Sequence, residues 1–442
     1  MTSEYDPIFW FSTILLATYW LHLLRKQPLG ASHIFIGLLL FFHGPAIIFY
    51  RDIWSVELGF GILSRLSDTD VASDRVILSL SIAFTIITVT KVISNLIFPI
   101  RSNHPVSSNP LHENQINYVK ALTLLSVAII LAALTLQYTM IAGPQKIVDY
   151  YFTDMSDYER GMIRREGNLG SYFFGVLIES IIPFISFVIL TSTLVKNPKR
   201  TAALTMSIVI LVLLAKLSRF TKAGPTLYLL QLFLCYSFVF RRTFFVTKKD
   251  ICFAIISILA TLMMVVGLGS GGDLLVAFDR LLMIPNEAIF EYFAAIPEFY
   301  PFGYGRGISY VQAIFGDAIG SASPLPVSMH VAAVTRGYTD TVVNGIYILD
   351  AWAEFGWIGI IFFSLATGIL LHWLDRKLLA IRYRPIKVAL IAYLLNGIYT
   401  LATSSLTSAL ITGGLLIVPV LASYIDRMRD PAHIKVANPI LK

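Results

Sequence analysis

Long apolar runs alternate with short polar segments along almost the whole chain. A membrane-crossing helix needs about 20 mainly apolar residues, because the hydrocarbon core of a bilayer is about 30 Å thick. Runs of this kind predict eleven spans, which are 7–24, 31–50, 76–98, 119–142, 170–195, 202–216, 225–240, 251–268, 353–373, 386–403 and 406–425. The pattern therefore predicts an all-α polytopic membrane protein in which residues 1–442 form a single integral membrane domain.

Composition agrees with this class. Only 14% of the 442 residues are charged and 56% are hydrophobic, whereas soluble domains carry about 25% charged residues. The net charge of +7 does not indicate a nucleic-acid partner, because the cations lie between apolar runs rather than in one patch. Cys235 and Cys252 are too few for a disulfide framework. The N-terminal segment is acidic, and the pair Arg25–Lys26 follows the first apolar run, so we expect no cleavable signal peptide.

The basic residues predict the orientation, because Lys and Arg near membrane spans favour the cytoplasmic side. With the N-terminus outside, twenty of the 34 Lys and Arg residues fall on inner segments and thirteen on outer segments, and Lys91 lies within a span. An odd number of spans then places the C-terminus inside. The long polar segment 269–352 consequently lies outside, which in a bacterial cell is the periplasm.

The segment 269–352 predicts a large extracytoplasmic loop that contains short helices. DLLVAFDRLLM has apolar residues at helical spacing and stops at Pro285. NEAIFEYFAAI follows, with Asn286 as its expected N-cap and its end before Pro297. In the next piece, PEFYPFGYGRGISY, Arg306 stands between two glycines among many aromatic rings. Such rings suit either the packing of sugar faces or an aromatic belt at the membrane interface.

Candidate chemistry gathers in the same loop. A single histidine more often stabilises structure than catalyses, but His330 shares the loop with arginines and carboxylates. Arginine forks match phosphate groups bidentately. Asp350 and Glu354 are four residues apart at the predicted outer end of a span, so they share a helix face. Two carboxylates there are costly unless they face water or a cation.

A second group of cations, at the end of an outer segment, includes Arg160, Arg164 and Arg165. Arg160 and Arg164 share a helix face because they are four residues apart. Ordinary pairing with nearby acids and an anion site at the membrane surface are both open interpretations.

A third group compresses Lys216, Arg219 and Lys222 into seven residues with no acidic neighbour in the sequence. A phosphate or pyrophosphate ligand is favoured here over contact with bulk lipid headgroups, because a helix restarts at Gly224–Pro225 and helix N-termini attract anions. Glu179 and Lys91 lie within predicted spans and are interpreted first as structural residues.

A short pattern in NGIYILDAWAEFGWIG carries a family resemblance. Its residues are Asn344, Leu349, Glu354, Gly356 and Gly359. With the many spans, the outer arginines, the late outer loop and the basic Ser218–Arg219 turn, the chain resembles the Wzy-type O-antigen polymerase and O-antigen ligase superfamily. The late loop of that family ends in His-Asn, then Leu, then Glu-x-Gly-x-x-Gly. Val343 stands where a ligase has its histidine, and this difference favours a polymerase.

The resemblance implies a metal-independent, GT-C-like glycosyltransferase without a cofactor, acting at the periplasmic face of the bacterial inner membrane. A polyprenyl-pyrophosphate-linked chain would lose its carrier as a hydroxyl of the incoming lipid-linked repeat unit attacks the anomeric carbon. The implied partners are these lipid-linked oligosaccharides, membrane lipids and a chain-length-regulating membrane protein. The late outer loop, residues 269–352, contains no DxD metal-binding motif.

The proposed chemistry assigns roles to the candidate residues. A base must accept the proton of the attacking hydroxyl, and the candidates, in order of preference, are His330, Asp279, Glu354 and Asp340. Cations must stabilise the departing pyrophosphate. The candidates for this role are Arg219, Lys222, Arg280, Arg306, Arg336, Arg160, Arg164 and Arg165.

Two alternatives remain open from the sequence. One is an O-antigen ligase, which transfers finished polymer to another lipid acceptor. The other is a transporter or flippase of lipid-linked sugars, which predicts paired halves and charged residues in the middle of spans. The sequence shows no internal repeat and concentrates its polar chemistry outside the spans, so it favours an enzyme over a transporter.

Overall fold

The computed structural model describes most of the apolar part of the chain. The described residues are 3–54, 69–99, 126–127, 129–134, 145–152, 159, 163, 175–196, 198–219, 223–241, 244–247, 283–306, 327–337, 343 and 345–427. These residues are predominantly helical and contain no β-strand. The expected all-α class is therefore confirmed for the part of the chain that the structure describes.

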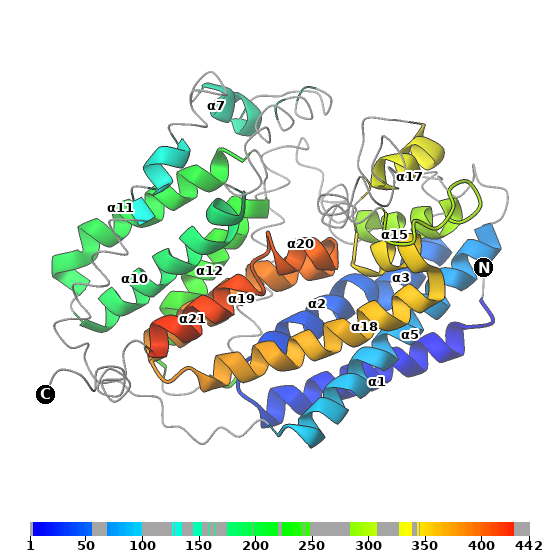
Figure 1. The fold of residues 1–442 in the computed structure, drawn as a ribbon, viewed down its shortest axis with the longest axis horizontal. Helices are drawn as coiled ribbons and strands as arrows, with labels where there is room; N and C mark the ends of the chain where they lie inside the picture. Colours follow the sequence, from blue (N-terminus) through cyan, green and yellow to red (C-terminus); the bar gives the residue numbers. More distant parts are fainter. Residues whose placement is uncertain are drawn as a thin grey trace, which may run out of the picture. The chain divides into compact units, whose positions relative to one another are not determined.

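The main helices are bounded as follows (Figure 1). They are α1 (Asp6–Lys26), α2 (Ala31–His43), α3 (Pro45–Phe49), α5 (Thr69–Ile97), α7 (Gln145–Phe152), α10 (Ile182–Lys196), α11 (Pro198–Leu217), α12 (Ala223–Val239), α15 (Ile284–Ala295), α17 (Val327–Arg336), α18 (Ile348–Ala380), α19 (Arg384–Thr403), α20 (Leu406–Leu410) and α21 (Ile417–Arg427). Two π-helical segments, η1 (Tyr50–Trp54) and η3 (Leu177–Ile181), interrupt the α-helical pattern.

Six helices within the described residues are long and apolar enough to cross a membrane. They are Asp6–Lys26, Ala31–Asp52, Val71–Ile97, Leu177–Val195, Ile348–Ala380 and Arg384–Thr403. Each corresponds to a predicted span. Two shorter apolar helices, Thr205–Leu217 and Gly224–Val239, occupy the predicted short spans. The predicted span 251–268 and most of 119–142 lie outside the described residues. The chain is thus a helical membrane protein.

The stretch 406–425, predicted as one span, is not a continuous helix. It divides into α20 and α21, with non-helical residues 411–416 between them. Two side chains satisfy carbonyl groups at this break: the Tyr393 hydroxyl donates to the Gly413 oxygen at 2.7 Å, and the Ser180 hydroxyl donates to the Thr412 oxygen. Because both donors come from distant helices, the apolar pattern of 406–425 alone could not reveal the break.

The chain divides into two compact units, each assembled from separate stretches of sequence. The first contains Met1–Pro99, Leu275–Trp373 and Ile398–Ala409. The second contains Ile100–Leu274, Leu374–Gly397 and Leu410–Lys442. Distant segments must therefore meet within each unit before its core can form.

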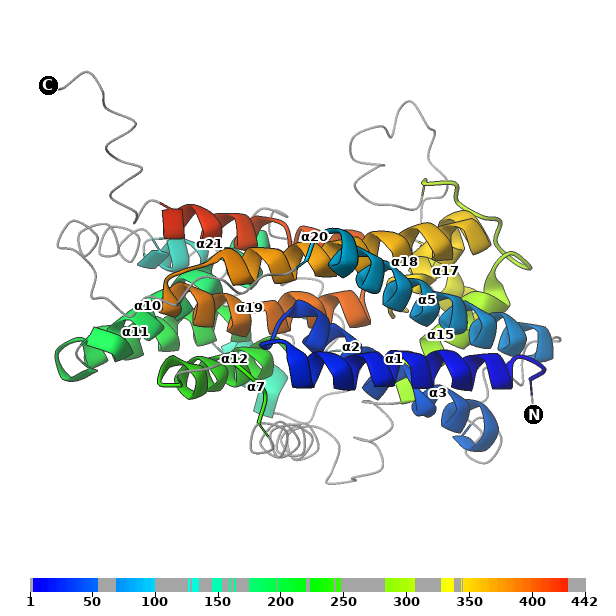
Figure 2. The same ribbon diagram turned by 90° about the horizontal axis from the view of Figure 1, so that it is seen from below.

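In the first unit, α1, α2, α5 and most of α18 lie side by side (Figure 1, Figure 2). α1 and α5 run in the same direction, since Ser3 bonds to Asp74 at their beginnings and Asn95 donates to the Tyr19 hydroxyl near their ends at 3.2 Å. His372, late in α18, contacts Asn95 at 3.1 Å, so α18 also runs this way. α2 turns back against α1. The beginnings of α1, α5 and α18 consequently lie at one end of this unit.

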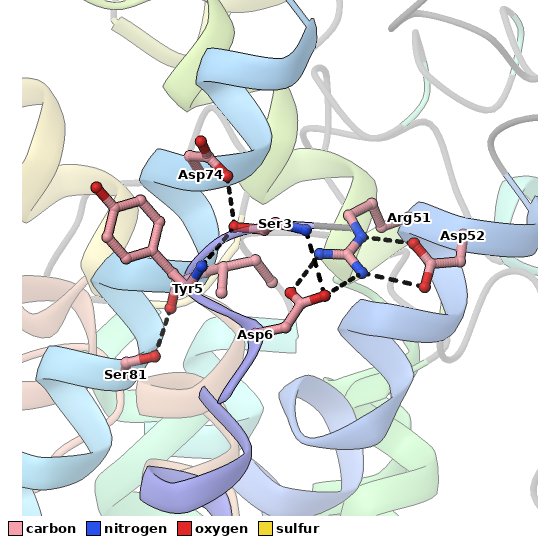
Figure 3. Close-up of polar contacts among 8 residues, drawn as sticks. Ser3, Tyr5, Asp6, Arg51, Asp52, Asp74 and Ser81 are labelled. Atoms are coloured by element: carbon pink, nitrogen blue, oxygen red, sulfur yellow. Dashed lines mark hydrogen bonds and ion pairs between the residues drawn. The ribbon is translucent and has the colours of Figure 1, made fainter. Parts of the chain in front are cut away.

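A buried arginine holds this end together (Figure 3). The guanidinium of Arg51 lies between two carboxylates: its distances are 2.6 and 3.0 Å to Asp6, and 2.6 and 3.0 Å to Asp52. The Arg51 side chain is only 2% exposed. Ser3 adds a contact to Asp74 at the beginning of α5. A guanidinium can be buried at this depth because the two carboxylates replace the water it loses.

α15 is attached to the same unit by Asn286. We expected this residue to be the N-cap of a helix, but α15 begins two residues earlier at Ile284, with Pro285 in its first turn, so that prediction was wrong. Asn286 is fully buried; its side-chain oxygen lies 3.0 Å from the His43 ring nitrogen, and its amide donates to the Phe42 carbonyl at 2.9 Å. The predicted end of this helix before Pro297 is confirmed, because α15 ends at Ala295.

The second unit packs α10, α11 and α12 around aromatic and hydroxyl contacts. Phe187 of α10 stacks on Tyr228 of α12 with ring centroids 5.3 Å apart, and the Tyr228 hydroxyl lies 3.0 Å from that of Ser186. α19 joins this unit through the Pro385 carbonyl, which accepts a hydrogen bond from the Thr191 hydroxyl at 3.0 Å. The buried hydroxyls of Ser186, Thr191 and Tyr228 therefore find partners within the bundle.

The Arg51 cluster yields a prediction for stability. Replacing Arg51 with methionine keeps much of the volume but leaves Asp6 and Asp52 without their cation, so we expect a loss of about 3 kcal/mol in the free energy of unfolding. The measurement is thermal unfolding of the purified protein in detergent. As a control, Arg75→Gln removes the exposed contact to Glu298, at 3.3 Å, and we expect that loss to stay below about 1 kcal/mol. Equal melting temperatures for the two variants would contradict the role given to Arg51.

Candidate functional site

Three segments of the first unit meet here: α15 with the turn that follows it, α17, and the beginning of α18, residues 348–355. Two backbone hydrogen bonds fix the turn to α18: Gly303 N–H donates to the Ala353 oxygen at 2.9 Å, and Tyr304 N–H donates to the Glu354 oxygen at 2.8 Å. The aromatic piece that the sequence singled out is thus held against the helix that carries Asp350 and Glu354.

The beginning of α18 is set apart by Gly356. This residue has φ 57° and ψ −137°, values that are not helical and that residues with a side chain rarely adopt. A Cβ at this position would also come within 3.1 Å of the Phe302 ring. The first eight residues of α18 therefore form a short helical piece with its own direction, and this piece presents the Glu354 carboxylate to the turn. Gly356 belongs to the pattern that carries the family resemblance.

Glu354 holds the turn closed. One of its carboxylate oxygens accepts a hydrogen bond from Gly305 N–H at 2.8 Å, and the residue is only 2% exposed. Gly303 lies directly against this carboxyl group, since a Cβ there would approach its carboxyl carbon to 2.8 Å. The sequence F-G-Y-G at 302–305 therefore allows the chain to wrap closely around a buried carboxylate.

The turn leaves Arg306 exposed beside an aromatic stack. The rings of Tyr300 and His330 stack with centroids 4.9 Å apart and an interplanar angle of 26°. Burial raises the pKa of Tyr300, the Glu354 carboxylate raises it further, and the Arg306 guanidinium opposes both. Tyr300 thus lies within electrostatic reach of both charges. Arg306 and Tyr304 are exposed, so a cation and a phenol ring face outward from the turn.

Arg336, at the end of α17, lies in an ion-pair cluster with α15. Its Nε and Nη2 donate to the two carboxylate oxygens of Glu291 at 2.7 and 3.0 Å, and Nη2 lies 3.8 Å from Glu287. Glu291 is 1% exposed, and burial raises its pKa, whereas the contacts with Arg336 lower it. Nε and Nη2 of the Arg336 guanidinium are therefore both engaged by Glu291. The sequence did not indicate this pairing, because 45 residues separate Arg336 from Glu291.

The second unit contains a separate charged cluster around Glu179. Lys216 is buried and pairs with the Glu179 carboxylate; it also donates to the Glu179 carbonyl at 3.3 Å. Arg219 Nε lies 3.8 Å from the same carboxylate. The basic turn has no acidic neighbour in the sequence, but it has one in space. Glu179 belongs to η3, and π-helical turns leave backbone groups open to other partners. Asn396 also approaches the Glu179 carbonyl at 3.5 Å.

The structure brings together some of the predicted site residues. His330, Arg306, Arg336 and Glu354 gather in the first unit, and Arg219 lies in the second. The others lie outside the described residues: they are Asp279, Arg280, Asp340, Lys222, Arg160, Arg164 and Arg165. Within the described part of the chain, no group of three His, Cys, Asp or Glu residues is placed to hold a metal ion.

Neither protein-family models, nor curated proteins, nor solved structures contain a significant match to this chain.

The Arg336–Glu291 pair predicts a pH-dependent defect. Arg336→Met leaves a buried carboxylate unpaired, and we expect a loss of about 3 kcal/mol near pH 8. The pKa of Glu291 is raised by burial, and the variant removes the contacts that lower it. The folded variant therefore binds this proton more tightly than the unfolded chain, so its stability is higher below the ordinary glutamate pKa of about 4.3 and is lost as the pH rises through the folded pKa.

Thermal unfolding of Arg336→Met between pH 5 and pH 8 in detergent, compared with the wild type, measures this effect. The double variant Arg336→Met/Glu291→Gln lacks the titrating group and serves as the control. We expect the pH dependence to disappear in the double variant. If the single and double variants show the same dependence on pH, Glu291 is not its source.

Proposed function

We propose that this protein is a polysaccharide polymerase that joins polyprenyl-pyrophosphate-linked oligosaccharide repeat units at one face of the membrane. The observation that carries the proposal is the exposed Arg306, which stands on a turn fixed to the beginning of α18 by three hydrogen bonds from consecutive backbone N–H groups. Beside it lies the stack of Tyr300 and His330. A cation, a ring surface and buried carboxylates thus meet at one end of the membrane helices of this unit.

The proposed reaction assigns a task to each of these groups. An acceptor hydroxyl attacks the anomeric carbon of the growing chain, the bond from that carbon to the pyrophosphate oxygen breaks, and the pyrophosphate leaves with the electron pair. Arg306 stabilises the charge that develops on the pyrophosphate, as preorganised cations do in group transfer. The exposed ring of Tyr304 supplies a face against which the C–H groups of a sugar ring pack, because aromatic faces carry partial negative charge.

Arg306 is a better candidate for the pyrophosphate than Arg336. Arg336 would have to leave Glu291, a buried carboxylate, before it could bind a phosphate, and removing one partner from such a pair is costly. Arg306 is exposed and stands on a turn whose geometry is already fixed. We therefore propose that Arg336 positions α17, and with it His330, while Arg306 contacts the ligand.

The membrane face and the partners extend the same proposal. The distribution of Lys and Arg favours placing this end of the first unit in the periplasm of a bacterial cell. The lipid-linked oligosaccharide donor and acceptor then approach from the outer leaflet. A membrane protein that regulates chain length is the partner that the family resemblance implies.

Removing the Arg306 charge should weaken chain extension. For purified Arg306→Gln in vesicles that contain a polyprenyl-pyrophosphate-linked oligosaccharide, we expect about 100-fold slower formation of longer lipid-linked products, measured as a ladder on a gel. Arg25→Gln is the matched control, because this exposed arginine lies at the other end of α1. A ladder that forms at the wild-type rate in Arg306→Gln would contradict the assignment.

The same assay separates the alternative functions. A ladder of longer lipid-linked products identifies a polymerase. Transfer of a finished chain to a second lipid, with no ladder from repeat units alone, identifies a ligase. Movement of unextended units across the vesicle bilayer identifies a transporter, and in that case the polymerase proposal fails.

A further inference from the structure

The proposed transfer needs a group that accepts the proton of the attacking hydroxyl, and most of the carboxylates near the turn are already engaged. Glu291 and Glu287 belong to the cluster with Arg336. Glu298 pairs with Arg75 at 3.3 Å. Glu354 is buried and accepts a hydrogen bond from Gly305. A base must reach the substrate. Because these four carboxylates are paired or buried, we expect the base among the other carboxylates of this unit.

Asp350 differs from all of them. It lies one helical turn before Glu354 on the same face of α18, but it makes no ion pair with any described residue, and it remains partly exposed. Its carboxylate accepts a hydrogen bond from the Ser405 hydroxyl. The neighbouring Tyr292 keeps its proton and so does not act as a base. Burial raises its pKa most, and the Asp350, Glu291 and Glu354 carboxylates raise it further.

The partner of Asp350 belongs to a segment rich in hydroxyl groups. Residues 403–408, T-S-S-L-T-S, run from the last residue of α19 into the beginning of α20, and all five hydroxyl-bearing residues are partly exposed. Ser405 Oγ lies 2.7 Å from Ser408 Oγ and 3.1 Å from Thr407 Oγ1, and it accepts a hydrogen bond from Ser408 N–H at 2.9 Å. Ser405 is thereby fixed beside the carboxylate. A sugar hydroxyl that reaches this segment meets serine and threonine hydroxyls with which it can form hydrogen bonds.

We propose that Asp350 is the general base of the transfer and that the hydroxyl-rich segment 403–408 binds the acceptor sugar. The inference rests on the proposed polymerase function. The acceptor O–H bond breaks as its oxygen bonds to the anomeric carbon, the pyrophosphate leaves with the electron pair of the broken C–O bond, and Asp350 takes the proton. The carboxylate is suited to this step because a hydroxyl already lies within hydrogen-bond reach of it and no cation occupies it.

Asp350→Asn tests this role with little change in shape. With purified protein and lipid-linked repeat units in vesicles, we expect chain extension at saturating substrate to slow by about 10²–10⁴-fold, the usual contribution of a general base. The substrate concentration for half-maximal rate should stay close to that of the wild type. Ser405→Ala should mainly raise that concentration. Glu298→Gln removes an exposed carboxylate nearby and should change neither quantity.

A second measurement does not depend on polymerase activity. A hydrophobic carbodiimide reacts with accessible carboxyl groups, so mass spectrometry should find Asp350 modified in the wild type, and less modified after preincubation with the lipid-linked repeat unit. Protection absent at Asp350, or extension by Asp350→Asn at the wild-type rate, overturns the inference while leaving the polymerase proposal standing. If the wild type extends no lipid-linked substrate, the polymerase proposal fails, and the role of Asp350 as its base fails with it.

Discussion

A charged side chain that is removed from water needs a partner of opposite charge or several hydrogen bonds, and this constraint shapes both units of the protein. Arg51 is buried between Asp6 and Asp52, Lys216 is buried against Glu179, and Glu291 is buried against Arg336. Asp52 is the sequence neighbour of Arg51, but Asp6 belongs to another helix, and the Lys216–Glu179 and Arg336–Glu291 pairs also join different helices. These pairs therefore form only when the helices take their native places. A mispacked bundle would leave an unpaired charge in an apolar surrounding, which costs several kcal/mol. Charge pairing therefore selects one arrangement among many that would bury apolar surface equally well.

The same constraint distinguishes side chains that support the site from those that are available to a ligand. The buried and paired groups, Glu354 and Arg336 among them, fix the turn and α17 to the rest of the unit. Arg306 projects from the fixed turn, and Asp350 is partly exposed and has a hydroxyl partner in Ser405. A site for a charged, hydroxyl-rich substrate needs both kinds of group, because catalytic groups act effectively only when their supports are rigid.

The apolar runs of the sequence were sufficient to place six membrane-crossing helices close to their observed bounds, and they marked the segment where α15 and the turn at 303–306 now lie. They failed at 406–425, where Tyr393 and Ser180 satisfy the carbonyl groups of a broken helix. The assignment of Asn286 as an N-cap was also wrong, because its side-chain amide contacts His43 and Phe42 instead of capping its own helix. Both errors arise from contacts with residues far away in the chain.

What the sequence by itself determined is which segments leave water, because the cost of crossing a bilayer sums over about 20 consecutive residues and can be read locally. It also supplied the candidate residues His330, Arg306, Arg336 and Glu354. Only the tertiary structure decided which of these are engaged. Arg336 meets Glu291 across 45 positions, and Lys216 meets Glu179 across 37. An ion pair depends on atoms that lie within a few ångströms of each other in space, and no local pattern of residue types contains that distance.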